Sequence, residues 1–264
     1  MDDRKIALIT GASRKVGIGA AIARQLACQG MDVFFTYYRP YDHESGLAGD
    51  PAEPLLLLAE LRQMGGHVES MELDLSVPDA PVWLFDQVEA SLGPVSVLVN
   101  NATYSMRDGI ENLTAELLDK TYALNLRGMA LLCAEFVRRF KKNMPPGIEA
   151  AGDVGGRIIN MSSGQARGPM PGELAYVATK GAVEAFTVSL SAEVGRLGIT
   201  VNAVDPGITD TGWITPDLKD KWTAGSYFGR VGLPEDAARL IGFLASDEGR
   251  WITGQVIHST GGLS

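Results

Sequence analysis

Tyr176 and Lys180 stand four residues apart in a stretch rich in helix-forming residues. Side chains at this spacing share one face of a helix, so the phenol and the ammonium should lie together. Because a nearby positive charge stabilises a phenolate, we expect Lys180 to lower the tyrosine pKa from about 10 toward working pH. The pair then predicts a general acid and base.

Two serines lie close upstream of this pair. Ser162 and Ser163 follow the β-rich run 158–161, and Ser163 is thirteen residues before Tyr176. A turn-rich segment, 164–172, separates the serines from the predicted helix. The hydroxyls, the phenol and the ammonium are therefore candidates for one site.

A glycine-rich turn, Thr10 to Gly19, follows the apolar run 6–9 and leads into the helical residues 20–23. In a doubly wound sheet, the first strand-to-helix turn holds a dinucleotide pyrophosphate at the helix N-terminus. Glycines indicate such a site only between a strand and a helix, which is where they stand in this chain. We expect a nicotinamide dinucleotide to bind here.

The end of the second predicted strand indicates which dinucleotide binds. An acid there usually binds the ribose hydroxyls of NAD, whereas a base accommodates the 2′-phosphate of NADP. No acid stands at Tyr37 and Tyr38, and Arg39 follows them. A guanidinium binds phosphate bidentately, so Arg39 could form a fork with Arg14 and Lys15. We expect NADP(H) in preference to NAD(H); the alternative is that Arg39 is a solvated loop residue.

The elements that position these residues alternate along the chain. Short β-rich runs occupy 6–9, 33–35, 68–73, 95–99, 158–161, 199–204 and 255–257, and helical stretches occupy 19–29, 54–64, 81–92, 114–142, 173–197 and 234–245. Several runs are apolar on successive residues, as in strands covered by helices on both faces. We therefore expect an α/β, Rossmann-like doubly wound parallel sheet of about seven strands, forming a single domain over 1–264.

Two segments, 39–53 and 145–156, carry many Gly, Pro and acidic residues and are predicted to be loops. Loops of this length in a compact α/β domain are either binding elements or insertions. We expect mobile insertions.

Composition excludes several classes of protein. The net charge of −9 offers no broad basic surface for nucleic acid or anionic membrane. No apolar run approaches the roughly 20 residues that cross a bilayer, and the first residues do not resemble a signal peptide, so we expect a cytoplasmic protein. Cys28 and Cys133 fall in predicted helices and are expected to be buried thiols.

Other catalytic classes lack their motifs. His43, His67 and His258 have no close Cys or acidic partners at metal-ligand spacing, so no metal site is expected. The absence of a Gly-x-Ser-x-Gly motif removes the obvious hydrolase interpretation.

Taken together, the motifs resemble the short-chain dehydrogenase/reductase family, and within it the 3-oxoacyl-[acyl-carrier-protein] reductases. The resemblance covers nearly the whole chain and rests on the turn 10–19, Asp74-Leu75, Asn100-Asn101-Ala102, Asn125, Ser163, Tyr176 with Lys180, Pro206-Gly207 with Thr211, the segment 229–236 and the segment 252–255.

The resemblance implies the chemistry of the site. Tyr176 would donate a proton to a ketone as hydride leaves the nicotinamide, and Lys180 would also hold the nicotinamide ribose. Ser163 would hydrogen-bond the substrate oxygen, with Ser162 the weaker candidate, and Asn125 would hold a water in a proton relay. Prepositioned donors of this kind stabilise the charge that develops on the carbonyl oxygen.

The cofactor residues that the resemblance and the glycine turn imply are Gly11, Ser13, Arg14, Gly17, Ile18, Gly19, Tyr37, Arg39, Asp74, Leu75, Asn101, Ala102, Tyr176, Lys180, Pro206, Gly207, Ile208 and Thr211. Asp74 and Leu75 would contact adenine, and Asn101 with Ala102 the cofactor ribose. Structural alternatives stay open, because Asp74 could cap a helix and Asn101 could fix a turn.

The chain departs from the 3-oxoacyl reductase pattern in its glycine turn. Five residues separate Gly11 from Gly17 where that branch has three, and the longer spacing resembles enoyl-carrier-protein reductases. Those enzymes place the tyrosine seven residues before the lysine, where this chain has Glu173. We therefore expect reduction of a ketone, first a 3-oxoacyl thioester of fatty acid biosynthesis carried on acyl carrier protein or CoA. Enoyl reduction and a redox-inactive NADP sensor are the alternatives.

The resemblance also implies a substrate lid and an assembly. The lid would span 213–228, with Trp213, Trp222, Tyr227 and Phe228 as its walls or, alternatively, as subunit contacts. Family members are commonly homotetramers built through two long helices and the last strand, and 114–142 and 173–197 could supply those helices.

Overall fold

Seven parallel strands form one sheet at the centre of the protein, in the order β3-β2-β1-β4-β5-β6-β7. The computed structural model describes residues 4–47, 49–143 and 155–262. The strands are β1 (Ile6–Ile9), β2 (Asp32–Tyr37), β3 (Val68–Glu72), β4 (Val97–Asn100), β5 (Gly156–Met161), β6 (Ile199–Asp205) and β7 (Val256–His258).

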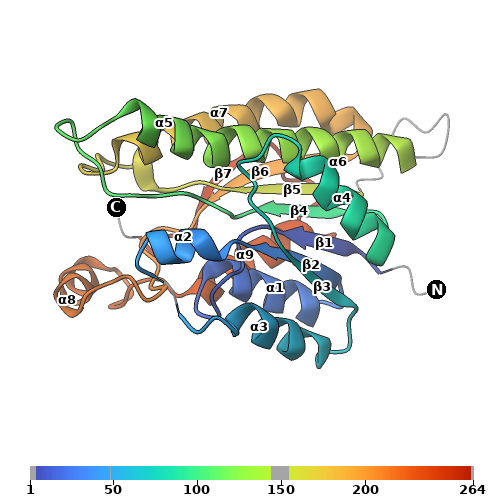
Figure 1. Cartoon of the computed structure of the whole chain (residues 1–264), viewed down its shortest axis with the longest axis horizontal. Helices are drawn as coiled ribbons and strands as arrows, with labels where there is room; N and C mark the ends of the chain where they lie inside the picture. Colours follow the sequence, from blue (N-terminus) through green and yellow to red (C-terminus); the bar gives the residue numbers. More distant parts are fainter. Residues whose placement is uncertain (1–3, 48, 144–154, 263–264) are drawn as a thin grey trace.

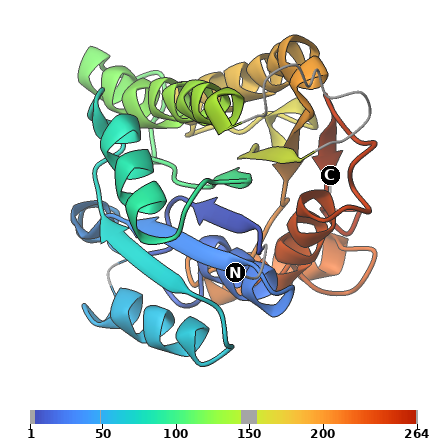
Figure 2. The same cartoon turned by 90° about the vertical axis from the view of Figure 1, so that its right-hand side faces the viewer.

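Helices cover both faces of the sheet (Figures 1 and 2). One face carries α1 (Ile18–Cys28), α3 (Glu53–Arg62) and α9 (Pro234–Ala245), and the other carries α4 (Ala80–Ser91), α5 (Ala115–Tyr122), α6 (Met129–Asn143) and α7 (Leu174–Val194). Each layer has its own buried apolar cluster against the sheet. The predicted Rossmann-like α/β fold, with a parallel sheet of about seven strands between helices, is confirmed.

Local sequence explains most of these elements. All residues of β1, β4, β5 and β6 are buried, as expected of parallel strands between two helix layers. Proline, whose fixed φ suits the first helical turn, starts α3, α4 and α9. The switch in strand order between β1 and β4 leaves a crevice at the carboxyl ends of the strands.

Two expectations about helices and loops were wrong, and one helix was not predicted. Segment 39–53 is not all loop, since α2 (Arg39–Glu44) forms there around Pro40. The predicted helix 114–142 is interrupted by a π-helical turn, Ala123–Gly128, between α5 and α6. A further helix, α8 (Pro216–Gly225), was not predicted. Of the predicted loop 145–156, Gly156 begins β5 and 145–154 lie outside the described residues.

The two cysteines differ. Cys133 is buried in α6, and burial raises the pKa of its thiol to about 12. Cys28 is exposed at the end of α1, contrary to the prediction, because the last turn of that helix reaches solvent.

Candidate functional site

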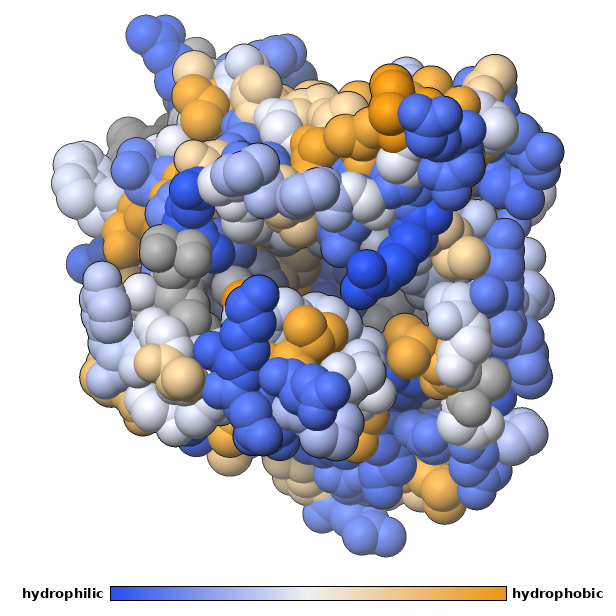
Figure 3. Space-filling model, turned by 90° about the vertical axis from the view of Figure 1, so that its left-hand side faces the viewer, coloured by the Kyte–Doolittle hydropathy of each residue, from blue (hydrophilic) through white to orange (hydrophobic). Residues whose placement is uncertain are grey.

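A cavity lies at the carboxyl ends of the strands, where the dinucleotide site was predicted. Figure 3 faces this side of the molecule, which is hollowed near its centre. Twelve predicted cofactor residues line the cavity: Gly11, Ser13, Arg14, Gly17, Ile18, Gly19, Tyr37, Asp74, Leu75, Asn101, Ala102 and Thr211. The structure thus brings together the end of β2 and the segments that follow β1, β3 and β4.

The glycine turn fits closely against the end of β4. Gly11 has φ +75°, and a Cβ there would lie 2.7 Å from the Cα of Ala102. A Cβ on Gly19 would lie 2.4 Å from the carbonyl oxygen of Gly11. Only glycine permits this close packing, and the cradle that the turn forms leads directly into the first turn of α1. The cradle therefore fits a dinucleotide pyrophosphate.

Asn101 holds the glycine turn in place. Its Nδ2 donates to the carbonyl oxygens of Thr10, at 2.9 Å, and Gly11, at 2.8 Å. The side chain lines the cavity but its amide hydrogens are directed to the turn. Asp74 similarly accepts from the Ser76 backbone N–H at 2.8 Å while lining the cavity.

The predicted fork of three basic residues is not assembled. Arg14 Nη1 donates to the Thr211 carbonyl oxygen at 2.8 Å, and Lys15 Nζ pairs with Glu60 at 3.4 Å. Arg39 does not line the cavity; its Nη1 lies 3.7 Å from Asp42 Oδ2. Two of these cations pair instead with acidic residues of α2 and α3. The prediction did not place these acidic residues near the turn.

The cavity also contains residues that were not predicted: Thr36, Tyr38, Tyr41, Asp42, Leu47, Leu73, Thr103 and Leu124. Four of them belong to the segment following β2, which therefore forms part of the pocket wall. The signal that could have revealed it is Pro40, which lies in the first turn of α2, where proline is common.

Tyr176 and Lys180 lie together in the first turns of α7. The Lys180 ammonium is 5.5 Å from the centre of the Tyr176 ring and donates to the Met161 carbonyl oxygen at 2.8 Å. Ser163 hydrogen-bonds the phenol. The predicted serine, tyrosine and lysine are thus gathered in one place.

The pKa of Tyr176 is raised, whereas we expected Lys180 to lower it. Burial raises the pKa of Tyr176 to about 12, outweighing the lowering by Ser163, and Glu173 and Asp205 raise it further. Burial also lowers the pKa of Lys180 to about 8. Desolvation is the largest influence on both groups, because a charged form that loses water is disfavoured.

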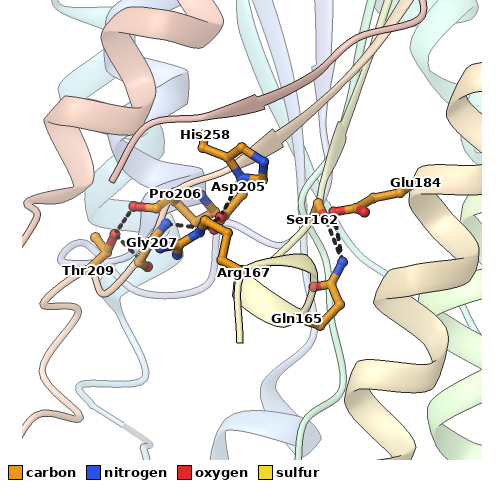
Figure 4. Close-up of polar contacts among 9 residues, drawn as sticks. All are labelled: Ser162, Gln165, Arg167, Glu184, Asp205, Pro206, Gly207, Thr209 and His258. Carbon is orange, nitrogen blue, oxygen red and sulfur yellow. Dashed lines mark hydrogen bonds and ion pairs between the residues drawn. The ribbon is translucent and has the colours of Figure 1, made fainter. Parts of the chain in front are cut away.

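The two serines have different partners, and Figure 4 shows those of Ser162. Ser162 Oγ is buried and donates to Glu184 of α7 at 2.5 Å, and Gln165 donates to both residues. Ser163 instead lies beside Tyr176. The hydroxyl of Ser162 is therefore committed to Glu184, which leaves Ser163 as the serine at the phenol.

Asn125 is buried in the π-helical turn and its side chain is fully used. Its Oδ1 accepts from the Tyr104 backbone N–H at 2.7 Å and from Thr103 at 3.2 Å. Its Nδ2 donates to the Tyr104 carbonyl oxygen at 2.8 Å and to Thr179 at 3.2 Å. The amide fixes the loop after β4 against α7.

Asp205, at the end of β6, connects three segments around the site (Figure 4). Its fully buried carboxylate accepts from the Gly207 backbone N–H at 2.8 Å and from Arg167 Nε at 2.8 Å. His258 of β7 lies 2.9 Å away. Neither Arg167 nor Asp205 was predicted, and the predicted residues Pro206, Gly207 and Ile208 lie on this side, outside the cavity described above.

A carboxylate from a distant loop caps the helix that carries Tyr176. Buried Asp108 accepts hydrogen bonds from the backbone N–H groups of Leu174 and Ala175, the latter at 2.7 Å. The first turn of a helix has unpaired N–H groups, so this contact fixes the start of α7.

The predicted lid residues divide into two groups. Trp213 and Trp222 are 5.6 Å apart between ring centres, and Trp213 Nε1 donates to the Thr209 carbonyl oxygen at 3.0 Å. Tyr227 and Phe228 are largely exposed.

Within the described ranges, the structure contains no cluster of three or more His, Cys, Asp or Glu side chains placed to hold a metal ion. None of the described helices is both long and apolar enough to span a membrane.

Comparison with known proteins finds relatives that are named as oxidoreductases or reductases. A family model described as enoyl-(acyl carrier protein) reductase matches residues 11–264. The chain is 49% identical over 259 residues to "Uncharacterized oxidoreductase YjdA" of Bacillus subtilis (strain 168), covering 98% of this chain and 96% of the relative. It is 34% identical to "NADPH-dependent aldehyde reductase-like protein, chloroplastic" of Arabidopsis thaliana, covering 98% and 93%.

A solved structure shows the same fold. The angucycline C-6 ketoreductase LanV with bound NADP matches with a TM-score of 0.82 and 32% identity, covering 98% of this chain and 95% of that one.

Proposed function

Since the chain belongs to the short-chain dehydrogenase/reductase family, we propose that it is an NADP(H)-dependent reductase that converts a ketone to a secondary alcohol. The observation that carries this proposal is the placement of Tyr176 beside both Lys180 and Ser163. Related proteins named as an NADPH-dependent aldehyde reductase and an NADP-bound ketoreductase support it.

The glycine cradle, Arg14, Asp74, Leu75 and Ala102 would hold the dinucleotide. When bound, NADPH supplies a hydride to the carbonyl carbon. Tyr176 then gives its phenolic proton to the carbonyl oxygen, and Ser163 donates a hydrogen bond to that oxygen as its negative charge grows. The reaction consumes one NADPH and one proton for each alcohol formed.

Lys180 replenishes the proton and holds the nicotinamide ribose in this proposal. Its position at the Tyr176 ring, with a pKa lowered to about 8, suits a group that exchanges protons near neutral pH. Because the side-chain amide of Asn125 is fully bonded, a relay water would be held by its backbone carbonyl, in a π-helical turn where the regular hydrogen-bond pattern is broken.

We propose a 3-oxoacyl thioester, on acyl carrier protein or CoA, as the first substrate to test. We also propose that the protein is a cytoplasmic homotetramer and that each subunit is a single domain over residues 1–264.

Enoyl thioester reduction is the second candidate. The five residues between Gly11 and Gly17 and the description of the matching family model favour it. Enoyl-carrier-protein reductases have their tyrosine seven residues before the lysine, and this chain has Glu173 at that position. The absence of a tyrosine at this position favours reduction of a ketone.

NADPH oxidation by the purified protein tests the choice, with a short 3-oxoacyl thioester, its 2-enoyl counterpart and NADH run in parallel. Oxidation with the oxo compound alone supports the proposal. Oxidation with the enoyl compound alone contradicts it in favour of the second candidate, and tight NADPH binding without turnover on a wider panel of ketones favours a sensor.

A further inference from the structure

The carboxylate of Asp42 lies inside the cofactor cavity, although the sequence has no acid at the end of β2. Asp42 belongs to α2, is 5% exposed, and lines the cavity beside Tyr38 and Tyr41. It therefore occupies the part of the pocket that follows β2, where the adenosine ribose or its 2′-phosphate would be distinguished.

The groups around this carboxylate are those that would otherwise meet a phosphate. Arg39, Arg14 and Ser13 each lower the pKa of Asp42, whereas burial, the largest influence, raises it and Glu53 adds to the rise. Arg39 Nη1 lies 3.7 Å from Asp42 Oδ2. The negative charge of Asp42 thus offsets the positive charge of the cations predicted to bind the phosphate.

Two atoms of this pair lack hydrogen bonds. Arg39 Nη1 and Asp42 Oδ2 are both buried and find no hydrogen-bond partner among the described residues. Their side chains are only 12% and 6% exposed. Buried polar groups are normally bonded, so this pair, of which Asp42 lines the cavity and Arg39 lies behind it, points to a place where a ligand group enters.

We propose that Asp42 is a specificity-determining residue for the cofactor: its carboxylate weakens the binding of a 2′-phosphate and so limits the preference for NADPH over NADH. This inference rests on the proposed NADP(H) site. A phosphate entering beside Arg39 and Arg14 meets one like charge at Asp42, and the ribose hydroxyls of NADH do not.

Adenosine nucleotides isolate this end of the cofactor from the chemistry. We would measure the affinity of the full-length protein for 5′-AMP and for adenosine 2′,5′-bisphosphate by calorimetry. Asp42→Asn keeps the size of the side chain and removes its charge, and Asp50→Asn makes the same change at an exposed position of the same segment.

Asp42→Asn should bind the bisphosphate about 10-fold more tightly, because removing a like charge a few ångströms from a phosphate in a partly buried site has an effect of this order. Its affinity for 5′-AMP should stay within about twofold, and Asp50→Asn should change neither value. Arg39→Gln, which leaves Asp42 uncompensated, should weaken the bisphosphate selectively and provides a second test if Asp42→Asn does not fold.

An unchanged bisphosphate affinity in Asp42→Asn overturns the proposal. So does a loss of 5′-AMP affinity, which would mean that Asp42 binds ribose hydroxyls instead. Both results leave the reductase proposal standing. Failure of all the proteins to bind either nucleotide contradicts the proposed function as well, because the cavity would then not be a nucleotide site.

Discussion

The carboxylate of Asp205 and the guanidinium of Arg167 are joined by a 2.8 Å hydrogen bond from Nε to Oδ2, between the end of β6 and the segment that follows Ser163. The other oxygen of Asp205 accepts from the backbone N–H of Gly207. One buried carboxylate therefore joins the segment that follows Ser163 to the segment that follows β6.

Asp205→Asn should lower kcat/KM by about 10-fold or more, because an amide has one acceptor oxygen and cannot accept from both Arg167 and Gly207, and small displacements of positioned groups are costly for reaction. The loss should fall mainly on kcat, with NADPH affinity less affected. Asp247→Asn, at an exposed aspartate paired with Lys5, is the control. An Asp205→Asn enzyme with unchanged kcat would contradict this positioning role.

The serines give a second prediction. Ser163→Ala should lower kcat by about 10² to 10³, the range for removing one donor to a developing oxyanion, with little change in NADPH affinity. Ser162→Ala should lower the melting temperature, since Glu184 loses a buried donor, but should keep most of the turnover. Steady-state kinetics and thermal melts of both variants check this, and the reverse assignment would show that Ser162 contacts the substrate.

Stability should depend on pH through Lys180. Its pKa is about 8 in the folded protein and near the ordinary value of about 10.4 in the unfolded chain. Below pH 8 both states carry the proton and the cost of burying the charge is fully present. Between pH 8 and about 10.4 only the unfolded chain retains it, so the free energy of unfolding gains a contribution that rises with pH.

Denaturant unfolding of the protein without added cofactor, at a series of pH values, measures this contribution. Lys180→Met is the matched variant, and the difference between the two proteins should grow in favour of the wild type from pH 8 to 10. A constant difference would mean that Lys180 titrates normally.

The parts of the site that sequence predicted are those encoded locally. Tyr176 and Lys180 are one helical turn apart, and the glycine turn is continuous in the chain, so spacing alone indicated both. Asp108 caps α7 from 66 residues away, and Asp205 meets Arg167 across 38 residues. Such pairs depend on how loops fold over the sheet.

The same reason explains why the sequence did not place Asp42 in the cofactor cavity. An acid was sought at the end of β2, whereas α2 turns the chain back so that an acid five residues later enters the cavity. The expectation that Lys180 lowers the pKa of Tyr176 was wrong for a related reason. Helical spacing indicates that two side chains are close but not how far they are buried.

Tyr176→Phe tests the central claim most directly, since it removes the proton donor and little volume. With a 3-oxoacyl thioester or another ketone that the wild type reduces, the variant should bind NADPH with unchanged affinity while kcat falls by about 10² to 10⁴. Retained turnover with equally tight NADPH binding would contradict the assignment of Tyr176 as the proton donor.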